Sequence, residues 1–154
     1  MRWAVIGIGI AIGSVVFAVF VVDYWLLDEG EVATLTTHAA DGETFETQVW
    51  VVDGAALSHE EGVVFLRSYR SDAAWLKRLV ASSAVELERD DWSLPYRAEP
   101  VADAALRERL NEAMSAKYGL ADRLLAPIFD PAAAVPVRLV PDASRSDQKV
   151  TPGH

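Results

Sequence analysis

The chain has 154 residues, 51% of them hydrophobic, which is enough for one compact domain with an appendage but not for two large domains. Its 14 Lys and Arg are outnumbered by 23 Asp and Glu, which excludes nucleic acid as a partner because phosphates need a basic surface. The same acidity disfavours a domain that lies flat on anionic lipid. The absence of cysteine excludes disulfides, thiolate metal sites and a cysteine nucleophile.

The N-terminal region is apolar over residues 3–22 except for Ser14. Twenty helical residues with a rise of about 1.5 Å each cover roughly the 30 Å hydrocarbon core of a bilayer. Tyr24 and Trp25 follow the run, at the depth where amphipathic rings prefer the lipid headgroups. The pattern predicts a single-pass transmembrane helix within an anchor over residues 1–27. A cleaved signal peptide is the alternative, but its apolar core is shorter, about 7 to 15 residues.

The charges next to the apolar run predict its orientation. Arg2 is the only Lys or Arg close to the run, and the next one along the chain is Arg67. The positive-inside rule therefore favours a cytoplasmic N-terminus with the domain outside. Gly9 and Gly13 form a G-x-x-x-G step, which either faces lipid or lets two helices approach closely.

A hinge over residues 28–33 leads into a soluble domain expected over residues 34–140. Short β-branched runs bounded by Gly, Asp and Pro are typical of strands joined by tight turns. The expected strands are 31–37, 45–52, a weak one near 56–57, 63–66, 84–89, 96–99 and 135–140.

One helix is expected between the fourth and fifth of these strands. Ser71 is placed to cap it, and it runs from Asp72 to about Ser82. Helical spacing puts four hydrophobic residues on one face: Trp75, Leu76, Leu79 and Val80.

A helix pair is expected near the end of the domain. The first helix runs over residues 103–118 with a buried stripe that includes Leu106 and Leu110, and Gly119 is placed to end it. A short helix follows over residues 121–126, and Asp130 with Pro131 starts one more turn. Residues 141–154 have few apolar side chains and are expected to form a disordered tail. The fold class is therefore α+β, with a small barrel-like sheet.

Several short segments of the domain stand in a characteristic order. They are Leu35-Thr36-Thr37, Trp50-Val51-Val52-Asp53-Gly54, Leu66-Arg67-Ser68 followed by Ser71 and Trp75-Leu76, Tyr96-Arg97-Ala98-Glu99-Pro100, Lys117-Tyr118-Gly119 and Val135-Pro136-Val137-Arg138-Leu139. This order resembles the split β-barrel flavoproteins, in particular the deazaflavin (F420)-dependent, nitroreductase-like branch.

The resemblance implies a homodimeric oxidoreductase that uses FMN or F420 to reduce a small organic substrate. It also implies a cofactor site, with Tyr118 as a substrate contact. The implied cofactor-binding residues are Thr36, Thr37, Trp50, Arg67, Ser68, Arg70, Ser71 and Trp75.

The stretch from Arg67 to Ser71 also indicates an anion site from its own chemistry. It joins a strand to a helix N-terminus, where unpaired N–H groups and the helix dipole favour a cofactor phosphate. Alternatively, the arginines pair with Asp72 or Glu61 and the serines only cap the helix. Trp50 likewise either stacks on a cofactor ring or packs in the core.

Other chemistries receive no support from the pattern. His38 and His59 lie in expected turns without metal-ligand spacing, so no metal site is predicted. No nucleophile elbow or catalytic triad surrounds Ser58 or Ser93, which disfavours a hydrolase.

One departure from the resembled family keeps a second function open. The turn over residues 38–42 lacks the Lys and Arg that the family often carries there, and F420 is a polyanion. Moreover, FMN and F420 are cytoplasmic cofactors, whereas the anchor favours a domain outside. The alternative is therefore a cofactor-free split-barrel module that serves as a membrane-tethered scaffold.

Overall fold

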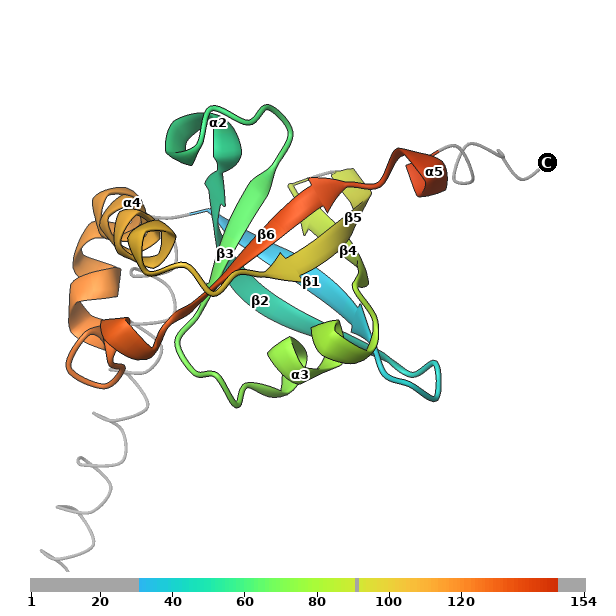
Figure 1. The fold of residues 1–154 in the computed structure, drawn as a ribbon, viewed down its shortest axis with the longest axis horizontal. Helices are drawn as coiled ribbons and strands as arrows, with labels where there is room; N and C mark the ends of the chain where they lie inside the picture. The colour runs from blue at the N-terminus through green and yellow to red at the C-terminus, as the bar shows by residue number, and fades with distance from the viewer. Residues whose placement is uncertain (1–30, 91, 147–154) are drawn as a thin grey trace, which may run out of the picture.

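The computed structural model describes residues 31–90 and 92–146 (Figure 1). The predicted anchor, and all of the hinge except residues 31–33, lie outside these residues. None of the helices in the two described ranges is long and apolar enough to cross a membrane. The elements are β1 (Val32–His38), β2 (Thr44–Asp53), α2 (Gly54–Leu57), β3 (Val64–Ser68), α3 (Ala74–Ala81), β4 (Ala84–Arg89), β5 (Trp92–Pro100), α4 (Ala104–Leu125), the 3-10 helix η2 (Pro131–Ala133), β6 (Val135–Pro141) and α5 (Ala143–Ser146).

The six strands form a closed barrel in the order β1-β2-β3-β6-β5-β4, in which β1 pairs with β4 to complete the ring. Every pairing is antiparallel. Helices α3 and α4 lie outside the barrel on different sides of it (Figure 1). The predicted α+β class with a small barrel is confirmed.

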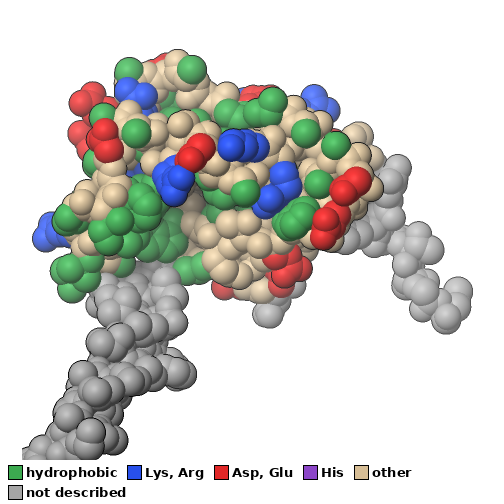
Figure 2. All heavy atoms as spheres, turned by 90° about the horizontal axis from the view of Figure 1, so that it is seen from below, with side chains coloured by type: hydrophobic (Ala, Val, Ile, Leu, Met, Phe, Trp, Pro, Cys, Tyr) green, Lys and Arg blue, Asp and Glu red, His purple; other side chains and the backbone are tan. Residues whose placement is uncertain are grey.

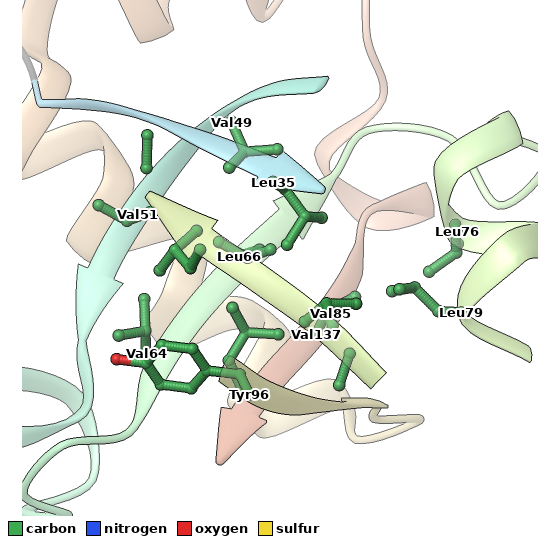
Figure 3. Packing of buried hydrophobic residues seen from close by; sticks show 14 residues of the cluster. Leu35, Val49, Val51, Val64, Leu66, Leu76, Leu79, Val85, Tyr96 and Val137 are labelled. Carbon is green, nitrogen blue, oxygen red and sulfur yellow. The ribbon is translucent and has the colours of Figure 1, made fainter. Parts of the chain in front are cut away.

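The barrel interior is filled by alternate strand residues. In β1, for example, Ala33, Leu35 and Thr37 are buried while the residues between them are only half-buried, as the two-residue period of a strand requires. Figure 3 shows Leu35, Leu66 and Val137 meeting inside the barrel, with side chains from α3 at one end. Barrels of about eight strands are just wide enough for side chains, so this narrower barrel leaves no ligand cavity inside.

Helix α4 packs its buried stripe against the outer face of the barrel. Leu106, Leu110 and Met114 contact barrel side chains that include Phe65. The stripe ends at Tyr118, whose hydroxyl accepts a hydrogen bond from the Val51 N–H (2.8 Å) and donates to the backbone carbonyl of Glu31 (2.7 Å). This packing attaches the start of the described chain to α4.

Gly119 breaks α4 into two helical segments. Its φ of 49° and ψ of −112° are non-helical, a conformation that side chains disfavour. Gly119 therefore ends the first segment, as predicted, and the second segment continues to Leu125, in agreement with the short helix expected over residues 121–126.

Several expectations are corrected. The weak strand near residues 56–57 is instead the helical turn α2, because the chain reverses sharply at Gly54, where a Cβ atom would lie 2.7 Å from the Glu60 carbonyl oxygen. The tail begins later than expected, since Pro141 ends β6 and Ala143–Ser146 forms α5. The rest of the expected tail lies outside the described residues.

Helix α3 also differs from expectation. It begins at Ala74 with Ala73 as the N-cap, and no side chain caps it. Ser71 cannot cap this helix because a turn, closed by the Ala73 N–H to the Arg70 carbonyl, comes first. Val80 is 81% exposed although Leu76 and Leu79 are buried, so only a narrow stripe of the helix touches the barrel.

We predict that Leu66→Ala lowers the free energy of unfolding by about 2–5 kcal/mol, because Leu66 is fully buried in the barrel and truncation leaves a cavity. Val80→Ala is the matched control and should change it by no more than about 0.5 kcal/mol. Urea unfolding of both variants measures the difference. Equal effects of the two substitutions would contradict this description of the core.

Candidate functional site

A groove of about 270 Å³ opens where strands β2 and β3 separate. Their pairing ends at Val51 and Leu66, and the next residue on each strand, Trp50 and Arg67, lines the groove. The first turn of α3 and Leu125 at the end of α4 complete the walls. The lining residues are Gln48, Val49, Trp50, Arg67, Ser68, Tyr69, Arg70, Ala73, Trp75 and Leu125.

Five of the eight predicted cofactor-binding residues meet in this groove: Trp50, Arg67, Ser68, Arg70 and Trp75. The remaining three lie elsewhere. Ser71 lines a neighbouring surface cavity that it shares with Arg70.

Thr37 is fully buried at the end of β1, where its hydroxyl accepts a hydrogen bond from Arg78 (2.8 Å). Thr36, next to it on β1, is paired with β2 and β4.

Tyr118 lies behind the groove wall. Its ring stacks on Trp50 with 4.4 Å between centroids and 7° between planes. Only 2% of Tyr118 is exposed, and burial raises the pKa of its hydroxyl to about 12. Tyr118 therefore holds one face of Trp50 in place from behind and stays protonated at neutral pH, so its position fits packing rather than substrate contact.

Arg67 is the most heavily engaged side chain of the groove. Its guanidinium forms an ion pair with Asp122 and hydrogen bonds to Tyr69 and to Asn111 (3.2 Å). The Arg67 side chain is 4% exposed and that of Asp122 12% exposed, so the pair is largely withdrawn from water. Asp122 neutralises the charge of Arg67, so Arg67 does not offer a free cation to a ligand. Its contacts instead hold the groove wall in position.

Tyr69 extends this network to the loop after α4. Its hydroxyl donates to Asp122 (3.0 Å), and its ring stacks on Phe129 with 4.7 Å between centroids. Burial raises the Tyr69 pKa to about 12. Tyr69 therefore remains a neutral donor, and it fixes one side of the groove to the second segment of α4.

Arg70 is the exposed cation of the groove. It pairs with Asp72 at 2.6 Å, and both side chains are more than half exposed. Pairing of Arg70 with Asp72 is the alternative to phosphate binding that was expected from the sequence. The Ser68 hydroxyl donates to the Arg70 carbonyl (2.8 Å), which holds the Arg70 backbone at the rim.

Three residues that contact Arg67 were not predicted from the sequence: Tyr69, Asn111 and Asp122. For Asp122 a signal was present, since Leu110, Met114, Tyr118 and Asp122 follow one another at intervals of four. That spacing keeps residues on one helix face, so it places an acid on the buried stripe. A buried acid needs a cationic partner.

The two histidines among the described residues differ in their exposure. His38 ends β1 and is half-buried rather than solvent-exposed, whereas His59 is exposed in a turn, as expected. Within residues 31–90 and 92–146, no group of His, Asp and Glu is arranged to hold a metal ion.

Known proteins resemble this chain in fold. No family model and no curated protein matches it. A conserved hypothetical protein from Mycobacterium tuberculosis superposes with a TM-score of 0.55 at 18% identity, over 80% of this chain and 79% of that one. A FAD-binding protein from Mesorhizobium loti gives 0.51 at 13% identity, over 73% and 82%.

A third solved structure comes from Clostridium acetobutylicum. This protein, related to general stress protein 26 of the pyridoxinephosphate oxidase family, gives a TM-score of 0.53 at 15% identity, over 75% of this chain and 78% of that one. At such identities the likeness concerns the fold alone. The described part of the chain thus shares its α+β barrel architecture with these three proteins.

We predict that Arg67→Leu destabilises the protein by about 3–5 kcal/mol, because it leaves the Asp122 carboxylate buried without its partner. The double variant Arg67→Leu/Asp122→Leu should recover much of this loss, since apolar replacements of a buried pair are often tolerated. Urea unfolding of the two variants tests this. If the double variant is less stable than the single variant, the pair does not act as described.

Proposed function

We propose that this protein is a membrane-anchored oxidoreductase that binds a flavin or F420 in the groove and reduces a small organic substrate. The observation that carries the proposal is the groove itself, which brings Trp50, Trp75 and the exposed Arg70 to one opening. The fold shared with a protein named for FAD binding supports the same class of cofactor. When bound, such a cofactor supplies hydride transfer.

The groove fits the planar part of such a cofactor. Trp50 and Trp75 are both half-buried, and aromatic side chains favour offset stacking on planar rings. Trp50 is held by the Tyr118 ring behind it, so its position is fixed before binding. The volume of about 270 Å³ is slightly below the usual range of ligand pockets, about 300–1,000 Å³, so the groove suits a ring system with the rest of the cofactor at the rim.

The rim offers groups for one phosphate. Arg70 is exposed, and its pair with Asp72 is of the exposed kind that contributes only about 0–1 kcal/mol, so an anion can displace the carboxylate. Ala73 and Trp75 in the groove wall belong to the start of α3. The first N–H groups of a helix lack partners within it and favour an anion.

These features favour FMN over F420. FMN carries one phosphate, whereas F420 carries a phosphodiester and a polyglutamate tail that need several cations. Arg67 is neutralised by Asp122, and the turn over residues 38–42 has no basic residue. Arg70 alone therefore suits a single phosphate better than a polyanion.

A cofactor-free scaffold remains the second candidate function. Two observations favour it: Tyr118 already covers one face of Trp50, and Asp122 already neutralises Arg67. In that case the groove would be a structural feature or the site of another ligand. A binding measurement separates the two functions directly.

We predict that the protein binds FMN and that Arg70→Ala weakens this binding roughly tenfold to a hundredfold, since a charge-assisted hydrogen bond contributes about 1.5–3 kcal/mol. Arg109→Ala is the control, because Arg109 is also exposed but does not line the groove. Titration of FMN and of F420, followed by fluorescence, provides the measurement. Binding of neither cofactor would leave the scaffold as the function.

We also propose that the protein is a homodimer, as the resemblance to split-barrel flavoproteins implies. Sedimentation of the detergent-solubilised chain at tens of micromolar should then give the mass of two copies. The Gly9→Leu/Gly13→Leu variant tests whether the predicted membrane helix contributes to the dimer, because close helix approach needs small residues. A monomeric mass for the wild-type chain would refute the dimer.

A further inference from the structure

The second segment of α4 and the loop after it expose three large hydrophobic side chains. Leu120 is 57% exposed, Leu124 52% and Ile128 71%. Their spacing of four residues places Leu120 and Leu124 on the same face of the helix, and Ile128 lies in the turn that follows α4. In Figure 2, hydrophobic side chains gather over the part of the molecule where Figure 1 shows α4 and the following loop. We call Leu120, Leu124 and Ile128 the apolar patch.

Few charged residues accompany the patch along the chain. Between Gly119 and Phe129 the only charged residues are Asp122 and Arg123. Asp122 is buried in its ion pair with Arg67, whereas Arg123 is exposed. Arg123 is therefore the exposed charge next to Leu124 in the chain, whereas Ile128 lines a surface cavity with Arg70 and with two acids, Asp72 and Asp130. Exposed Leu and Ile side chains next to an arginine suit lipid, because the guanidinium can stay at the level of the headgroups.

The start of the described chain contacts the end of the first α4 segment, just before Leu120 in the chain. The Glu31 carboxylate pairs with Lys117 (2.9 Å), and its backbone carbonyl accepts a hydrogen bond from Tyr118 (2.7 Å). These two residues directly precede Gly119 and Leu120. The N-terminal part of the chain therefore joins the domain at the same end of α4 that carries the patch.

The length of the connection limits how far this end can lie from a bilayer. Only residues 23–30 separate the apolar run from Glu31, and eight extended residues reach at most about 29 Å. A domain of this size has a radius of gyration of about 13 Å. If residues 3–22 span a bilayer, the patch is therefore held within about one domain diameter of its surface.

We propose that the apolar patch rests on the surface of the lipid bilayer that holds residues 3–22. This inference rests on the membrane anchor in the proposed function. A second copy of the chain is the competing occupant, but three side chains cover far less than the roughly 800 Å² per partner of a stable interface. The contacts of Glu31 with Lys117 and Tyr118, which come just before Leu120, also favour the bilayer.

Single-cysteine variants can test this, because the chain contains no cysteine of its own. The full-length chain with Leu124→Cys, and separately with Ile128→Cys, is labelled with a polarity-sensitive fluorophore and reconstituted in phosphatidylcholine vesicles. Some of the lipids carry a spin label near the headgroup end of the acyl chain. Val80→Cys is the matched control, since Val80 is an exposed apolar residue on α3, outside the patch.

We expect a blue shift of emission and spin-label quenching at Leu124 and Ile128, and neither effect at Val80. A blue shift without quenching would point to a second protein copy on the patch and would overturn the proposal, as would equal quenching at all three positions. If the full chain fails to float with the vesicles, the anchor and this inference both fall. FMN titration remains a separate readout, so failure of the cofactor proposal can be recognised independently.

Discussion

The candidate site depends on the separation of β2 from β3 beyond the Val51–Leu66 pair. A six-stranded barrel filled by its own side chains has no room for a ligand inside, so a site must form where neighbouring strands part. β3 remains paired with β6 through Arg67 and Ser68, whereas Trp50 leaves β3 and pairs only with β1. The opening therefore has two firmly held walls, and its width is set by the sheet rather than by a loop.

The ion pair between Arg67 and Asp122 links this opening to α4. Buried pairs of this kind are weak sources of net stability, but loss of one partner is costly. The pair therefore acts mainly as a positional constraint, because it permits one placement of the second α4 segment against β3. Tyr69 adds a hydroxyl to the same carboxylate and a ring to Phe129. Together these contacts place Leu125 in the groove wall.

The sequence predicted most of the fold because strand periodicity and turn residues are local signals. β4 appears with the predicted bounds, and Gly119 breaks α4 where expected. Val80 was predicted on the apolar face of α3 but is exposed. Helical spacing identifies the apolar face of a helix, but it does not show how much of that face the barrel covers. Arg67 was predicted as a site residue, and it lines the groove. Its ion pair was not predicted, because its partner Asp122 lies 55 residues away in the chain. The helical spacing places Asp122 on a buried face, but it does not identify Arg67 as the partner.

Gly119 gives the second segment of α4 its two roles. A continuous helix would keep the direction set by the packing of Leu110 and Met114 on the barrel, whereas the break lets the second segment turn. Its inner face then supplies Asp122 to the ion pair with Arg67 and Leu125 to the groove wall, while its outer face exposes Leu120 and Leu124. A residue with a Cβ at this positive φ would be strained, so the same glycine allows both the groove wall and the exposed apolar face.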